Sequence, residues 1–101
     1  SMVEKAGIIQ FYEMTFELAW KTLKDYLNLE GFDVNSPRQS IKQAFQSSLI
    51  DDGHVWIAAL EDRNLTVHTY DENKAELVVD AIRNKYYPEL TKLCVRFQEL
   101  D

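Results

Sequence analysis

The sequence predicts an all-α protein, an up-and-down bundle of four or five helices. Apolar side chains recur with the spacing of helix faces, and no segment alternates with a two-residue period for long enough to form a sheet. Only 3 Gly and 2 Pro occur among the 101 residues, which leaves little room for loops. Residues 3–101 are therefore expected to form a single helical domain, after a tag remnant and the start at Ser1-Met2.

The first helix is expected to run from about Glu4 to Glu30 and to end at Gly31, which can adopt the left-handed conformation of a helix cap. One of its sides carries an apolar stripe with helical spacing, made of Tyr12, Phe16, Ala19, Leu23 and Leu27. A second apolar stripe lies on a different side and consists of Phe11, Met14 and Leu18. We therefore expect other parts of the structure to cover this helix on more than one side.

The second helix has a clear start. Ser36 can cap it, the missing N–H of Pro37 costs nothing in a first turn, and Gln39 completes a capping box. The helix is expected to stop near Ser47-Ser48. Its inward side is expected to consist of Ile41, Ala44 and Phe45.

Two more helices follow. Asp51-Asp52 can cap the third, which is expected to begin around His54. The pattern resets at Thr69-Tyr70-Asp71, where the aspartate is a good N-cap for a fourth helix. Tyr87-Pro88 either kinks that helix or starts a short fifth one, because proline disrupts a helix interior.

Charge and composition exclude several classes of protein. The net charge is −6, so the chain lacks the basic stripe of a generic nucleic-acid binder; DNA is not expected as a partner, and any phosphate recognition must be local. No run of eighteen apolar residues predicts a membrane span. Cys94 is the only cysteine, which excludes an internal disulfide and fits the cytoplasm; we expect it to be a small core residue.

The segment from Leu60 to Asp71 concentrates the side chains that can carry chemistry. The planar fork of Arg63 can clamp a phosphate, and His68 can exchange a proton near neutral pH. These roles suit phosphodiester cleavage, in which a 2′-hydroxyl loses a proton and the leaving oxygen gains one. Residues five apart on a straight helix point roughly 140° from each other. The two side chains would thus converge if the helix end bends, or across a homodimer, the more natural arrangement.

Structural roles can explain the same residues. Arg63 can pair with Asp62 or Glu61, and the dipole at a helix end favours His68 there.

Other candidates rank lower. Trp20 and Trp56 can stack on a nucleobase, but with apolar neighbours at helical spacing they are more often core residues. Lys21 and Lys24 can position a nucleotide, although a solvated helix face is the simpler account. His54 follows two aspartates, but the spacing matches no metal site, so neither a metal nor another cofactor is expected.

Three stretches resemble the signature segments of the nucleotidyltransferase substrate-binding family. They occur in that family's order and at similar separations, and the resemblance covers about Ile8 to Leu100. The stretches are Phe16-Glu17-Leu18-Ala19-Trp20-Lys21, Ser36-Pro37-Arg38 and Glu61-Asp62-Arg63-Asn64-Leu65-Thr66-Val67-His68-Thr69-Tyr70-Asp71.

That family belongs to the HEPN superfamily, whose mark is an arginine, a polar residue and, a few positions on, a histidine. Arg63, Asn64 and His68 match this mark, and Tyr70 matches the longer form found in HEPN toxins. In such toxin–antitoxin pairs the HEPN subunit is an RNase, and a minimal nucleotidyltransferase silences it by attaching AMP to the tyrosine. The resemblance therefore implies Arg63 and His68 as a catalytic pair and Tyr70 as a modification site.

Three functions follow as hypotheses. The favoured one is a substrate-binding subunit that partners a separate minimal nucleotidyltransferase and binds RNA or a nucleotide. The alternative is a metal-independent RNase toxin, an endoribonuclease that the partner silences; the third is a purely structural interaction module. The resemblance adds four binding or motif residues, which are Asp62, Asn64, Trp20 and Lys21.

One departure from the family pattern stands out. Family members usually carry a helix before the segment that opens this chain, and here that helix is expected to be absent or shortened. Part of the Phe11, Met14 and Leu18 stripe would then be bare, and we predict that a second copy or a partner subunit covers it. With no glycine-rich phosphate loop and no Gly-Ser motif with paired aspartates, the chain is not itself a nucleotidyltransferase.

Overall fold

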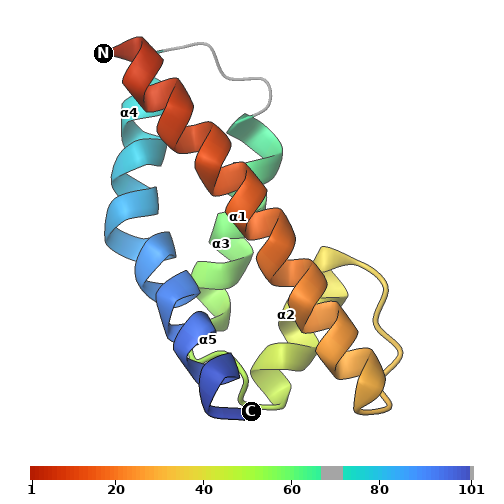
Figure 1. Cartoon of the computed structure of the whole chain (residues 1–101). Coiled ribbons are helices and arrows are strands. Elements are labelled where there is room, and N and C mark those ends of the chain that lie inside the picture. Colours follow the sequence, from red (N-terminus) through yellow and green to blue (C-terminus); the bar gives the residue numbers. More distant parts are fainter. Residues whose placement is uncertain (67–71, 101) are drawn as a thin grey trace.

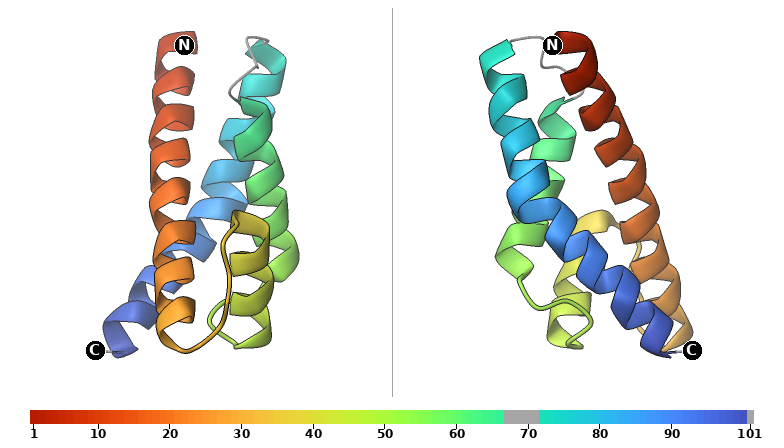
Figure 2. Two further views of the ribbon diagram at one scale, coloured as in Figure 1. Left: turned by 90° about the vertical axis from the view of Figure 1, so that its right-hand side faces the viewer. Right: turned by 60° about the vertical axis from the view of Figure 1, so that its left-hand side comes forward.

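The computed structural model describes residues 1–66 and 72–100, and within these ranges the chain folds as the all-α bundle that the sequence predicts, with no strand (Figure 1). The α-helices are α1 (Met2–Leu29), α2 (Pro37–Gln46), α3 (Gly53–Thr66), α4 (Glu72–Ala81) and α5 (Tyr87–Leu100). A π-helical segment, Ile82–Tyr86, joins α4 to α5, so that three elements form one long rod (Figure 2).

Helix α1 sets the length of the molecule. Its 28 residues correspond to about 42 Å of helix, and the longest dimension of the structure is 44 Å. The α4–α5 rod lies obliquely to α1, while α3 and then α2 pack against α1 (Figures 1 and 2). Helix α1 is therefore the longest element of the fold, and every other helix contacts it.

The core forms along the first apolar stripe of α1, as predicted. Tyr12, Phe16, Leu23 and Leu27 are at most 1% exposed. Phe16 lies against Trp56 of α3, with ring centroids 5.9 Å apart, and Tyr12 stacks on Tyr86 at 5.5 Å. Aromatic contacts of this kind add to the free energy gained from burying the rings.

The helix ends follow the predicted chemistry, with one difference at α2. Gly31 has a φ of +99°, the left-handed conformation that favours glycine. Ser36 caps α2 by accepting from the backbone N–H of Gln39 at 3.2 Å. The side chain of Gln39 accepts from the backbone N–H of Asn35 instead of that of Ser36, so the capping box is displaced by one residue.

The start of α3 and the end of the chain are tied together. Asp52 accepts from the backbone N–H of Val55 and so caps α3. Arg96 of α5 donates to the carbonyl oxygens of Ser48 and Leu49, both at 2.9 Å, and pairs with Asp51 at 3.2 Å. The predicted capping role thus belongs to one aspartate, and the other anchors the last helix to the turn between α2 and α3.

The helical rod continues past Pro88 without a break, because the π-helical segment joins α4 directly to α5. In a regular α-helix the proline ring would meet the carbonyl four residues earlier. Here the backbone N–H of Tyr87 bonds to the carbonyl of Ile82, five residues back, and the wider turn relieves that contact. The sequence predicted a kink or a new helix; the structure has a π-helical segment in an otherwise unbroken rod.

Two predicted core residues are not in the core. Phe45 is 52% exposed, because it lies near the end of α2 and covers the backbone of Gly53. Cys94 is exposed as well. Its neighbour Leu93 takes the inward position of α5, at 5% exposed, and the next residue on a helix points about 100° away. None of the helices in the described ranges is long and apolar enough to cross a membrane.

Candidate functional site

The polar cluster of the molecule centres on an ion pair between α1 and α3. The guanidinium Nη2 of Arg63 donates to Oε2 of Glu17 at 2.6 Å, across 46 positions of sequence. Both side chains are 32% exposed, so the pair lies at the edge of the core, where water screens it only in part. The pair brings two of the three signature stretches of the sequence together in space.

Two further donors converge on the same carboxylate. The indole Nε1 of Trp20 donates to Oε2 of Glu17 at 3.0 Å, and Nζ of Lys21 lies 3.4 Å from Oε1. Burial by itself would raise the pKa of Glu17, but the hydrogen bond from Trp20 and the charges of Arg63 and Lys21 lower it below its ordinary value. Glu17 is therefore a stable anion that fixes Arg63 in place.

The inner wall of the cluster is aromatic. The hydroxyl of Tyr86 donates to the carboxylate of Asp62, and the hydroxyl of Tyr12 donates to the carbonyl of Ala59. Burial first, and then the hydrogen bond to Asp62, raises the pKa of Tyr86 above its usual range. Burial likewise raises the pKa of Tyr12. Both tyrosines thus remain neutral donors, and they hold α3 at a fixed depth against α1 and the π-helical segment.

A second hydrogen bond, to Asn64, orients the side chain of Arg63. Its Nη1 donates to Oδ1 of Asn64 at 3.3 Å, and Asn64 is exposed. The motif asparagine therefore stands beside the guanidinium at the solvent side of the cluster. The Lys21 side chain, which pairs with Oε1 of Glu17, is 56% exposed.

The remaining predicted site residues are His68 and Tyr70. Both lie outside the described residues, so the structure leaves the predicted pairing of His68 with Arg63 and the modification of Tyr70 as predictions. The residues that precede them are described. Helix α3 ends at Thr66, two positions before His68, and Arg63 lies in the last turn of α3.

Sequence reasoning missed the partner of Arg63. It offered Asp62 or Glu61, but adjacent side chains on a helix point in different directions and do not face each other. Asp62 instead accepts from Tyr86, and Glu17 of another helix binds Arg63. Glu17 lies inside one signature stretch, and its spacing of four from Lys21 gives it a partner within α1 as well.

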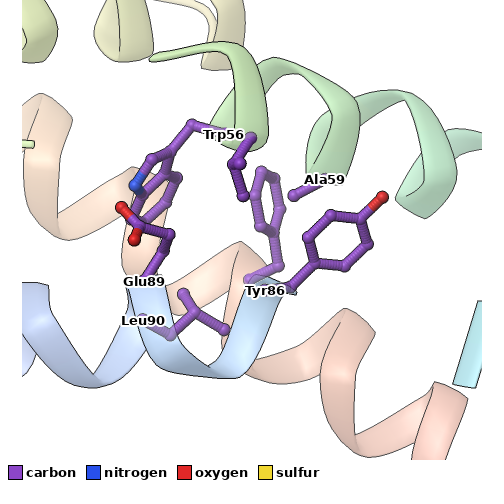
Figure 3. A pocket seen from close by; sticks show the side chains of 7 residues that line it. Trp56, Ala59, Tyr86, Glu89 and Leu90 are labelled. Carbon is purple, nitrogen blue, oxygen red and sulfur yellow. The ribbon is translucent and has the colours of Figure 1, made fainter. Parts of the chain in front are cut away.

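The other candidates have structural roles. Trp56 is 2% exposed, as predicted for a core residue, and its Nε1 has no hydrogen-bond partner in the described part of the chain. It lines a cavity of about 10 Å³ together with Glu89, and Figure 3 shows the labelled side chains around this space. Trp20 is only half-buried. No group of acids, histidines and cysteines among the described residues could hold a metal ion, and His54 is exposed.

Comparison with known proteins agrees with the resemblance found in the sequence. The family described as "Nucleotidyltransferase substrate binding protein like" matches residues 1–99. A curated relative from Haemophilus influenzae, "Probable ribonuclease HepT", is 35% identical over 78 residues, and the match covers 72% of this chain and 53% of the relative. The chain spans about half the length of that relative. The chain therefore belongs to the nucleotidyltransferase substrate-binding protein-like family, whose model matches residues 1–99.

Proposed function

We propose that this chain is a metal-independent ribonuclease subunit that works beside a separate minimal nucleotidyltransferase, with Arg63 as its phosphate-binding residue and His68 as its proton-transfer residue. The observation that carries the proposal is the Glu17–Arg63 pair, which brings two signature stretches into one polar cluster. The name of the Haemophilus influenzae relative, a ribonuclease, supports the same class of reaction.

The chemistry needs a cation fixed near a group that can exchange protons. Arg63 would neutralise the charge that develops on the phosphate when a 2′-hydroxyl attacks it. His68, two positions beyond the end of α3 in the sequence, would take the proton of that hydroxyl or return one to the leaving 5′-oxygen. One histidine cannot be both base and acid in a single step, so a two-fold dimer that supplies a second His68 fits the reaction better than a monomer.

Glu17 contributes by fixing the guanidinium before the substrate arrives. An arginine side chain carries much rotamer freedom, and the fixed carboxylate removes part of it in advance. The Nη2 group of Arg63 donates to Glu17, and its Nη1 group donates to Asn64.

The test is an RNase assay on total RNA and on tRNA, in the presence of EDTA, with the wild-type protein and the Arg63→Ala and His68→Ala variants. We expect cleavage by the wild type and its loss in both variants. The matched control is Arg83→Ala, which removes an exposed arginine outside the cluster and should leave cleavage intact. Absence of cleavage by folded wild-type protein, or equal loss in the control, would contradict the proposal.

The second candidate function is a non-catalytic substrate-binding subunit for the same nucleotidyltransferase. Two observations favour it: the family description names substrate binding, and α1 presents an exposed apolar stripe on which another protein can dock. In this case the Arg63 cluster binds the phosphate of a nucleotide or RNA without cleaving it. Binding of labelled RNA that is lost in Arg63→Ala, without any cleavage, would identify this function.

Tyr70 is the proposed point of control. Attachment of AMP to its hydroxyl would add bulk and a negative charge within seven positions of Arg63, where the RNA phosphate must bind. In the second candidate function the same residue would be the acceptor of the transferred group.

A further inference from the structure

A groove between α2 and α3 takes no part in the contacts of Arg63. Its volume is about 250 Å³, and we call it the α2–α3 groove. Ile41, Lys42 and Phe45 of α2 line it, together with Gly53 and Ile57 of α3. Apolar side chains and a cationic one therefore border the same surface hollow.

The two helices that form the groove run in opposite directions (Figure 2). At one end Phe45 of α2 lies against Gly53 of α3. One helical turn further along, Ile41 and Ile57 line the groove together. The end of α2 therefore lies beside the start of α3, and the start of α2 lies beside the second half of α3.

The same register brings the groove to the Arg63 cluster. It places Arg38, in the first turn of α2, level with Leu60 of α3. Leu60 precedes Arg63 by three residues, which is about 4.5 Å of helix. On α3, positions 53, 57, 60 and 64 share one side, and Asn64 at the last of them accepts from Arg63. The groove side of α3 therefore ends at the arginine of the motif.

The exposed face of α2 beside the groove is cationic. Arg38, Lys42 and Phe45 follow each other at spacings of four and three, so they share one side of the helix, and all three are exposed. Helix α2 contains no acid, although the whole chain has a net charge of −6. Neither Arg38 nor Lys42 makes an ion pair or a hydrogen bond with any described residue. Two such cations in an acidic chain favour an anionic ligand at this place.

Phe45 adds an aromatic surface to the two cations. Its side chain is 52% exposed, but the ring is held against the first turn of α3. A Cβ at Gly53 would lie only 3.2 Å from ring atoms of Phe45, so glycine at this position allows the close contact. An exposed ring that is already in place is a platform on which a nucleobase of any kind can stack.

We propose that the α2–α3 groove binds the stretch of single-stranded RNA next to the phosphate at Arg63. Arg38 and Lys42 contact successive phosphates, and Phe45 stacks on a base. The two cations are about 6 Å apart along the helix, a step that one nucleotide of an extended strand can span. Cations in a row beside an aromatic ring are the combination that binds single strands without reading their sequence. The proposal rests on the proposed function, because the strand continues from the Arg63 cluster.

This assignment gives a role to the third signature stretch, Ser36-Pro37-Arg38, which the Arg63 cluster does not contain. Ser36 caps α2, and Pro37 occupies its first position. Together they fix where the helix begins and therefore where Arg38 stands. Two of the signature stretches then position the arginine at the cleaved phosphate, and the third positions the neighbouring part of the strand.

Base stacking is tested by fluorescence anisotropy with a labelled 2′-O-methyl RNA of about ten nucleotides. This RNA has no 2′-hydroxyl to attack the phosphate, so it is bound without being cleaved. We expect Phe45→Leu to weaken binding about tenfold, because leucine still covers Gly53 but offers no ring. The matched control is Phe45→Tyr, which keeps the ring and should bind like the wild type.

The dependence of binding on salt tests the phosphate contacts. For single strands, each phosphate contact adds about 0.7 to the slope of log K against log salt concentration. Arg38→Ala and Lys42→Ala should each lower the slope by about this amount, whereas Phe45→Leu should weaken binding at an unchanged slope. The control is Arg83→Ala, which removes an exposed arginine of the π-helical segment and should keep the wild-type slope.

The outcomes separate this proposal from the proposed function. Groove variants that bind RNA like the wild type would overturn the groove assignment, even if Arg63→Ala abolishes cleavage. A loss in Phe45→Tyr as large as that in Phe45→Leu would overturn the stacking. The expected binding pattern without any cleavage by the wild type would support the groove and contradict the ribonuclease. A folded wild-type protein that binds no RNA would overturn both.

Discussion

Trp20 and Arg63 donate hydrogen bonds to the same oxygen of Glu17, one from α1 and the other from α3. An indole and a guanidinium that share one acceptor fix its position more tightly than either does alone. The motif residues of two separate segments thereby act together to position Arg63.

Replacement of Glu17 by Gln should reduce activity through this placement. The amide can still accept from Trp20, but it no longer offers a charge to Arg63, so the guanidinium gains freedom. If the proposed RNase activity holds, we expect kcat to fall about tenfold with a smaller change in KM. Trp20→Phe, which removes only the second donor, serves as the milder comparison. An unchanged kcat in Glu17→Gln would exclude a positioning role.

The stability that Glu17 provides should depend on pH with a definite sign. Its pKa in the folded protein is lowered from the ordinary value of 4.5, so the stabilisation is fully present above that value and is lost as the pH falls through the folded-state pKa. Urea unfolding should show Glu17→Gln to be less stable than the wild type at pH 7. The difference should shrink as the pH falls below 4.5 and through the folded-state pKa of Glu17, and a difference that does not change with acid pH would contradict this account.

The two buried tyrosine hydroxyls should differ in what their removal costs. Tyr12→Phe takes one donor from the carbonyl of Ala59 and should cost about 1 kcal/mol of unfolding free energy. Tyr86→Phe leaves the carboxylate of Asp62 without that donor and should cost more, about 2 kcal/mol. Denaturant midpoints for both variants check the order, and a reversed order would show that Asp62 finds water instead.

Alanine should have opposite effects at two glycines of the chain. Gly31 has a φ of +99°, so Gly31→Ala should destabilise the fold by about 1 kcal/mol. Gly7 lies in helix α1 with open space around its Cα, and Gly7→Ala should stabilise the single chain by about 0.5–1 kcal/mol. Thermal unfolding at submicromolar protein, where dimerisation contributes least, provides the comparison.

Tyr70→Phe should abolish transfer of AMP by the partner nucleotidyltransferase, since the phenylalanine lacks the acceptor oxygen. Labelling with radioactive ATP and mass spectrometry of the intact chain would measure the transfer. Tyr26→Phe, which removes the hydroxyl of a half-buried tyrosine near the C-terminal end of α1, is the control. Labelling that persists in Tyr70→Phe would place the modification elsewhere.

The sequence predicted the fold well because helix faces and caps are local properties. The stripe from Tyr12 to Leu27, the left-handed Gly31 and the cap at Ser36 each depend on a few neighbouring residues. The π-helical segment before Pro88 could not be read in the same way, because a kink, a new helix and a wider turn all satisfy the local requirement.

The site was predicted only in part, for a related reason. The motif residues were found through their pattern, but the partner of Arg63 depends on how α1 and α3 pack, and 46 positions separate the two residues. Cys94 shows the same limit: an apolar neighbourhood in sequence did not reveal which way the residue faces on α5.

The contacts of Arg96 have a consequence for synthesis of the chain. The two carbonyls that it binds, at Ser48 and Leu49, belong to the turn between α2 and α3, yet their donor lies in α5, 48 and 47 positions later in the chain. Helices α1, α2 and α3 therefore emerge from the ribosome with this turn unsecured, and it can be fastened only after α5 has emerged. Helices α1 to α3 must therefore wait for α5, and until then their apolar faces are open to chaperones.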